Sequence, residues 1–190
     1  MKLRPAEIEN PVTTIWEIDP AHSSAGFSVR HMMIANVKGE FSKVTGRVEF
    51  DGGNIERSSI DASVDVNSIS TREAARDTHL KSADFFDAAN FPAMTFNSKR
   101  FEKDSGDNIK LIGDLTIRGT TREVALALEG PTPPMKDPWG NVRRGASAAG
   151  KINRKDFGLT WNAALETGGV LVGDEVSITL DVELILKSAE

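Results

Sequence analysis

The sequence predicts an all-β domain that closes into an eight-stranded antiparallel barrel. About eight segments carry an apolar residue at every second position, which is typical of strands with one buried and one solvated face. The pattern is clearest over residues 176–186, where Val, Ile and Leu alternate with polar residues. Long helical patterns are scarce, so the apolar faces must cover one another. Closure into a barrel achieves this, and a barrel of about eight strands can hold one small ligand.

Each expected strand is defined by the apolar residues of one face. The first four strands carry Phe27, Val29, His31 and Met33, continuing beyond a bend through Val37 and Phe41; then Val44, Val48 and Phe50; then Ile60, Ala62, Val64 and Val66; then Met94 and Phe96. The last four carry Ile109, Leu111, Leu115 and Ile117; Val124, Leu126 and Leu128; Ala146, Ala148, Gly150 and Ile152; and the apolar residues of 176–186. Small residues in the seventh strand would leave room for a neighbour or a ligand.

Two segments interrupt the alternation. Residues 70–87 begin with Ser70-Thr71-Arg72-Glu73, a capping sequence that predicts one or two short helices across an end of the barrel. Residues 130–144 are rich in Pro and Gly and predict a long loop. With 190 residues the chain has the length of one domain. We expect an N-terminal arm over residues 1–14 and a single barrel domain over residues 15–190.

Composition excludes several classes of function. The chain contains no Cys, which rules out thiol nucleophiles, zinc-thiolate sites and iron–sulfur ligation. The net charge of −5 disfavours binding to nucleic acid. No apolar run has the length of a signal peptide or a membrane span, so we expect a cytoplasmic protein without an integral membrane segment.

Catalytic patterns are also missing from the sequence. None of His22, His31 and His79 lies in a nucleophile elbow, the acidic residues alternate with apolar ones as a solvated face does, and no phosphate-binding glycine loop is present. We therefore predict neither an enzyme nor a bound cofactor. One alternative is a metal- or haem-associated protein in which the three histidines converge from separate strands. Another is a stress-associated module that acts through a partner protein.

The apolar faces supply a candidate ligand-binding wall. Its predicted members are Phe27, Val29, Met33, Phe41, Val48, Phe50, Val64, Phe96, Leu115, Ile117, Phe157 and Trp161. Composition alone favours an ordinary packed core for these residues, but the same wall would suit a long apolar chain. His31 shares the apolar face of its strand and is a candidate polar contact. Arg30, Lys38, Arg118, Arg143 and Arg144 are candidates for a head group.

Four motifs, in order, resemble the YceI family of bacterial lipocalin-like polyisoprenoid-binding proteins. They are residues 16–23 (WEIDPAHS) with 27–33 (FSVRHMM) and 37–41 (VKGEF); 79–87 (HLKSADFFD) with Phe91-Pro92 and Phe96; 113–121 (GDLTIRGTT); and 154–158 (RKDFG) with 161–162 (WN) and 171–176 (LVGDEV). The resemblance covers about residues 15 to 187. Ala146 departs from the family pattern, which places an aromatic residue there.

This resemblance implies a lipocalin-like antiparallel barrel whose interior holds a polyisoprenoid or a fatty-acyl derivative. It also implies a homodimer and no catalytic machinery. Many relatives are periplasmic, whereas this chain shows no leader. We therefore expect a non-enzymatic protein that binds, stores or transports a long-chain apolar lipid.

Overall fold

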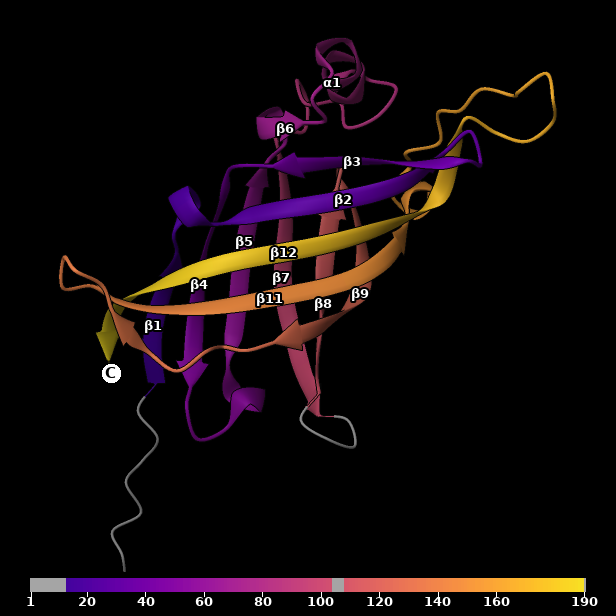
Figure 1. Ribbon diagram of the computed structural model, residues 1–190. Helices are drawn as coiled ribbons and strands as arrows, with labels where there is room; N and C mark the ends of the chain where they lie inside the picture. Colours follow the sequence, from indigo (N-terminus) through magenta and orange to yellow (C-terminus); the bar gives the residue numbers. More distant parts are fainter. Residues whose placement is uncertain (1–12, 104–107, 190) are drawn as a thin grey trace, which may run out of the picture.

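A computed structural model of the chain describes residues 13–103 and 108–189 and confirms the all-β barrel (Figure 1). The strands are β1 (Thr13–Ile18), β2 (Ser24–His31), β3 (Ala35–Phe41), β4 (Val44–Asp51), β5 (Ser59–Asp65), β6 (Ile69–Ser70), β7 (Ala93–Lys103), β8 (Ile109–Ile117), β9 (Thr120–Glu129), β10 (Met135–Lys136), β11 (Val142–Asn153) and β12 (Val172–Ala189). The helices are α1 (Ala74–Lys81) and the 3-10 turns η1 (Pro20–His22), η2 (Ile55–Arg57), η3 (Val66–Ser68) and η4 (Arg154–Phe157). β1 begins at Thr13, inside the predicted arm, and residues 1–12 lie outside the described part.

The barrel closes through β12, which is paired along both edges. One edge pairs with β11 over residues 175–185 of β12, and the other edge pairs with β2 and then with β1. The remaining strands complete the ring in the order β11, β9, β8, β7, β5, β4 and β1. Neighbouring strands are antiparallel throughout. The alternation predicted for residues 176–186 therefore belongs to the strand that joins the two edges of the sheet.

Three of the ring's strands are interrupted by short breaks. β1 and β2 are separated by η1 but lie along the same edge of β12. β3 pairs with β2, and β4 pairs with β1. β3 and β4 therefore also act as one strand, which bends at residues 42–43. β5 and β6 are divided by η3 in the same way. At each break the chain changes direction, but the two parts of the strand keep the same position in the ring.

The predicted boundary between the first two strands is wrong. The chain reverses at residues 32–34, where β2 and β3 form a hairpin, and residues 42–43, expected to separate two strands, are only a bend. Met32 and Met33 have φ values of 50° and 62° in the left-handed region. Tight hairpin turns require this conformation, but Gly or Asn usually provides it, so the sequence lacks the usual turn signal.

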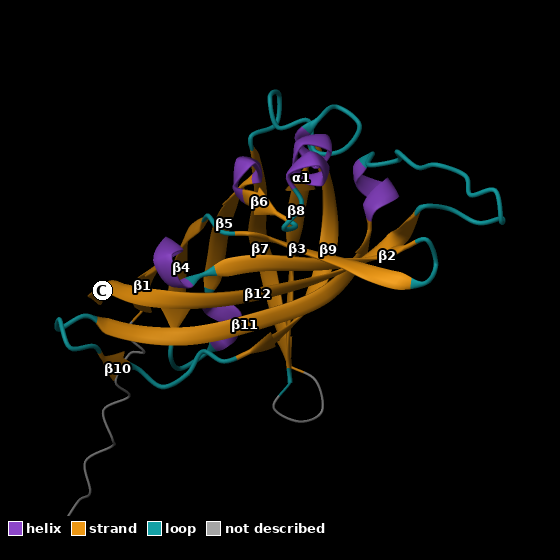
Figure 2. Ribbon diagram, turned by 45° about the horizontal axis from the view of Figure 1, so that its top comes forward, coloured by secondary structure: helices purple, strands orange, loops and turns teal. Residues whose placement is uncertain are grey.

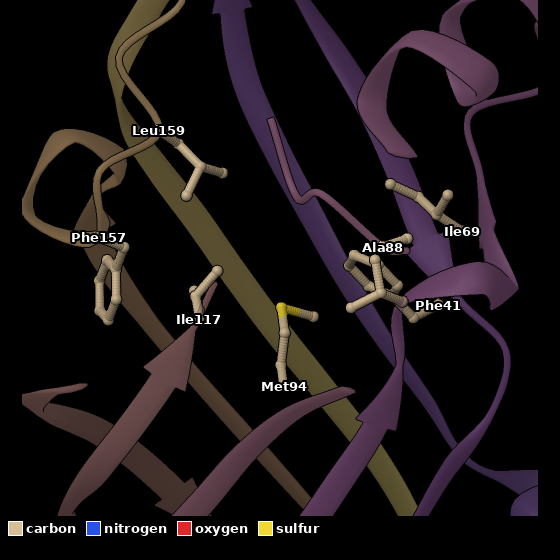
Figure 3. Packing of buried hydrophobic residues seen from close by; sticks show 8 residues of the cluster. Phe41, Ile69, Ala88, Met94, Ile117, Phe157 and Leu159 are labelled. Carbon is tan, nitrogen blue, oxygen red and sulfur yellow. The ribbon is translucent and has the colours of Figure 1, made fainter. Parts of the chain in front are cut away.

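α1 and the segment that follows it lie across one end of the barrel (Figure 2). The Glu73 carboxylate accepts a hydrogen bond from the Ala75 backbone N–H at 3.3 Å and caps the helix. Leu80 and Phe86 pack on a buried cluster beneath α1, which includes Phe41 and Met94 (Figure 3). The predicted helical segment at 70–87 is confirmed as a single α-helix of eight residues. The predicted loop at 130–144 includes β10 and the first residues of β11.

Arg143 ties several segments together on the outside of the barrel. Its guanidinium donates hydrogen bonds to Asp137 at 2.6 Å, to Asp19 at 2.7 Å and to Glu183. Asp19 also lies 2.8 Å from His22 Nδ1. The contacts with His22 and Arg143 lower the pKa of Asp19 from 3.8 to about 2. The ionised Asp19 therefore stabilises the fold.

We expect this stabilisation to disappear in acid. The folded-state pKa of Asp19 is depressed, so its contribution is complete above pH of about 4 and is lost as the pH falls toward about 2. Asp19→Asn should lower the free energy of unfolding by about 1 to 2 kcal/mol at pH 7, after allowance for solvent screening. Urea unfolding at several pH values should show the two proteins converging as the pH falls through this range. A difference that is constant from pH 7 to pH 2 would contradict the role of Asp19.

The hairpin turn offers a second test. An L-residue in the left-handed region is strained by roughly 1–2 kcal/mol, whereas Asn-Gly adopts this conformation readily. Met32→Asn combined with Met33→Gly should raise the free energy of unfolding by about 1 kcal/mol, and the melting temperature by about 2–4 °C. Ile34→Ser is the control, because Ile34 is equally part of the turn and 75% exposed but has no positive φ. Equal melting temperatures for the double variant and the unmodified protein would rule out strain at the turn.

Candidate functional site

The barrel encloses a cavity of about 380 Å³. This volume is within the range of small-molecule sites in proteins, roughly 300–1,000 Å³. The wall is built from inward-facing residues of the ring strands and is almost entirely aliphatic and aromatic. The predicted wall residues that line the cavity are Phe27, Val29, Phe41, Val48, Phe50, Val64, Phe96, Leu115, Ile117, Phe157 and Trp161.

Met33, the remaining predicted wall residue, lies outside the wall. It lies in the β2–β3 hairpin turn, its side chain is 57% exposed, and it does not line the cavity. The error follows from the hairpin, because alternation between the two faces ends where the strand ends.

β11 and β12 show how alternation builds the wall. Val176, Ile178 and Leu180 of β12 face the cavity, and Ala148 of β11 lies opposite Leu180 in the ladder. Ala146 also lines the cavity, so this part of β11 presents small side chains to the interior. Because these side chains are small, free space remains between β11 and the larger residues of the neighbouring strands. The aliphatic residues of β12 and the alanines of β11 together form a smooth apolar surface.

Polar side chains border the cavity near α1, but their polar atoms have partners within the protein. Arg154 is 4% exposed and donates to the backbone oxygens of Leu159, Trp161 and Gly173 at 2.7–2.8 Å. His79 Nε2 lies 2.8 Å from Asp84 Oδ2, and its ring meets Trp161 edge-on at 4.7 Å. Arg154 and His79 therefore hold the loops around this end of the cavity.

The predicted head-group residues occupy different places. His31 and Arg30 border the cavity at the end of β2, and the Arg30 Nε donates to the Met33 carbonyl at 3.2 Å. Arg118 lies in the β8–β9 turn and donates to the Phe85 carbonyl at 3.2 Å. Arg143 points outward into its acidic cluster. Neither Arg118 nor Arg143 lines the cavity, although Arg143 borders a second pocket outside it, so their role in binding a head group stays a prediction.

Arg144, the next residue on β11 and also a predicted head-group candidate, faces inward. Its guanidinium carbon lies 5.1 Å from the ring centroid of Trp16 and 4.8 Å from that of Phe50. Its Nε is buried without a hydrogen-bond partner, and burial lowers the pKa of the guanidinium. The alternation of the strand accounts for this inward orientation, because Arg144 shares the face of Ala146 and Ala148, whereas Arg143 has the opposite orientation.

The alternative based on three histidines receives no support from the geometry. In residues 13–103 and 108–189, the group of His and acidic side chains close enough to share a metal ion is Asp19, His22 and Glu183, without His31 or His79. Arg143 donates to both carboxylates of that group, so a cationic side chain already occupies the position where a metal would bind. Within the same described ranges, no helix is both long and apolar enough to cross a membrane.

Comparisons with solved structures place this barrel among known folds. A YCEI protein from Campylobacter jejuni is 32% identical, with a TM-score of 0.69 over 84% of this chain and 90% of the other. Burkholderia cenocepacia BcnA shares the fold with a TM-score of 0.73 at 23% identity, over 87% of this chain and 98% of BcnA. A polyisoprenoid binding domain from Saccharophagus degradans has a TM-score of 0.65 at 13% identity, over 90% and 98% of the two chains.

Sequence comparisons identify the family. UPF0312 proteins from Staphylococcus aureus are 36% identical over 174 residues, which cover 92% of this chain and 99% of theirs. The family model for the YceI-like domain matches residues 16–184. The chain that folds into this barrel with an apolar interior therefore belongs to the YceI-like family.

Proposed function

We propose that this protein binds, stores or transports a long-chain apolar lipid, a polyisoprenoid or a fatty-acyl derivative, inside the barrel and without catalysing a reaction. The observation that carries the proposal is the 380 Å³ cavity with its apolar wall. The Saccharophagus degradans domain, which has the same fold, is described as polyisoprenoid-binding, and this supports the ligand class. The homodimer and the cytoplasmic location stay predictions.

The energetics favour a long chain. Each methylene group that moves from water into the cavity contributes ~0.8 kcal/mol, while association costs roughly 4–15 kcal/mol of translational, rotational and ordering free energy. A ligand that buries only a few methylene groups cannot offset that cost. A chain that buries ten or more gains ~8 kcal/mol or more, so the wall selects for length even without polar contacts.

The engaged polar groups support a binding role rather than a catalytic one. At the α1 end of the cavity, the guanidinium of Arg154 is bound to backbone oxygens and His79 to Asp84. A general base or a nucleophile must be free to reach a substrate atom within hydrogen-bond distance. These residues instead have the partners expected of groups that hold the wall in place.

Paired substitutions on β11 test the proposal. Ala148 faces the cavity opposite Leu180, whereas its neighbour Ala149 is exposed on the outer face. Ala148→Phe should fill the space and weaken the binding of a long-chain polyprenol by at least about tenfold, because the ligand and the ring compete for one volume. Ala149→Phe is the matched control and should bind as the unmodified protein does.

Tryptophan emission provides the readout, because Trp16 and Trp161 line the cavity. Trp139 is 83% exposed, so Trp139→Phe in every protein removes the background signal. Ligand binding to the native state should also raise the melting temperature by mass action. Equal polyprenol affinity in the Ala148→Phe and Ala149→Phe proteins would contradict binding inside the barrel, as would a melting temperature that long-chain lipids never change.

A further inference from the structure

Arg144 lies at the end of the cavity away from α1. It is the third residue of β11 and stacks on Phe50, the penultimate residue of β4. The C-terminal end of β4 lies at the opposite end of the barrel from α1 (Figure 1). Arg144 also borders a second pocket, of about 810 Å³, beneath the loop that carries β10. It therefore stands where the apolar interior meets a more open and polar space.

The charges around the two neighbouring arginines are unequal. Arg143 contacts three carboxylates, those of Asp19, Asp137 and Glu183. Within the described ranges, no carboxylate forms an ion pair with Arg144, and its Nε is buried without a partner. The faces of Trp16 and Phe50 attract the cation but accept no hydrogen bond from its N–H groups in the guanidinium plane. A buried N–H without an acceptor is unfavourable, and a bound anion that accepted a hydrogen bond from it would relieve this cost.

The surroundings of Arg144 suit the head of an amphiphile. A guanidinium presents a planar fork of N–H donors that matches a carboxylate or a phosphate. Ala146, the next inward-facing residue on β11, lines both the cavity and the second pocket, so little side-chain volume separates the two spaces. The acidic residues of the second pocket are Glu129, Asp137, Asp181 and Glu183, of which Asp137 and Glu183 form ion pairs with Arg143 and none forms one with Arg144.

We propose that Arg144 binds the anionic head group, a carboxylate or a phosphate, of a long-chain amphiphile whose tail extends through the cavity toward α1. This inference rests on the proposed function and adds the orientation and the head-group class of the ligand. Arg144 selects by charge, and the apolar wall selects by chain length.

Ligands with one chain and different heads test this assignment. Oleic acid, oleyl phosphate and oleyl alcohol carry the same tail, so differences in affinity at pH 8 report the head group. The unmodified protein should bind at least one of the anionic ligands at least about tenfold more tightly than the alcohol, because charge-assisted hydrogen bonds exceed neutral ones. The stronger of the two anions identifies a carboxylate or a phosphate as the natural head group.

Arg144→Met should abolish this preference and leave the affinity for oleyl alcohol within about twofold. The stability of the ligand-free variant should equal or exceed that of the unmodified protein, because a buried N–H without an acceptor has been removed. Arg47→Met is the control, because Arg47 is an exposed arginine of β4 that pairs with Glu49. This variant should leave the preference for the anionic ligand unchanged. Arg144→Lys keeps the charge but lacks the planar fork, and should retain a weaker preference.

Three results would overturn the assignment. One is equal affinity of the unmodified protein for all three ligands, a comparison that needs no variant. Another is an Arg144→Met protein that keeps the preference for the anion. The third is an Arg144→Met protein that loses stability without any change in the ratio of affinities, since this would make the stacking on Trp16 and Phe50 purely structural. Failure of all three ligands to bind would instead overturn the proposed function itself, together with this inference.

Discussion

The antiparallel ladder between β11 and β12 is the interaction on which the rest of the structure depends. It joins the two edges of the sheet from Arg143 opposite Ile185 to Asn153 opposite Glu175. Without this ladder, β11 and β12 would each present an unpaired edge, and the apolar face of the sheet would be open to water. Its register also decides which residues face inward. A slip of β11 by one residue would turn Arg143 toward the cavity, away from its acidic partners, and turn Arg144 to the outside.

Closure alone does not create a cavity, because side chains can fill a barrel of this size. The space arises from the distribution of volumes around the ring. β11 supplies Ala146 and Ala148 to the interior, while the large buried residues gather in separate clusters, such as Phe41, Met94 and Phe157 near α1. A second cluster forms around Trp16 and Val44. Members of both clusters also line the cavity, so the free space lies among them and is bounded by apolar side chains.

Much of this architecture could be predicted from the sequence because alternation is a local property. The inward orientation of Val29, Phe96 and Leu115 follows from the two-residue period of a strand, and the structure places these residues on the cavity wall. The Asp51-Gly52-Gly53-Asn54 segment indicates a turn, which the Asp51 carboxylate stabilises through the Gly53 and Asn54 N–H groups at 2.9 and 3.0 Å.

Other features depend on contacts between distant segments. The hairpin at Met32 and Met33 lacks turn residues, and the neighbouring strands impose its left-handed backbone. Arg143 and Arg144 are chemically identical in the sequence. Only the positions of Asp19, Asp137 and Glu183, which lie far apart along the chain, show that Arg143 is already paired. The free volume of the interior likewise depends on the side chains of all the strands. No local sequence pattern predicts it.

Native mass spectrometry of the gently purified protein, followed by organic extraction and identification of the released compounds, tests the central claim most directly. The account predicts a mass excess that corresponds to one long-chain lipid in each barrel and that disappears after extraction. It also predicts that the extracted protein takes up such a lipid again and becomes more stable to heat. Protein that is always isolated empty, and that neither binds long-chain lipids nor gains stability from them, would contradict the claim that the barrel is a lipid container.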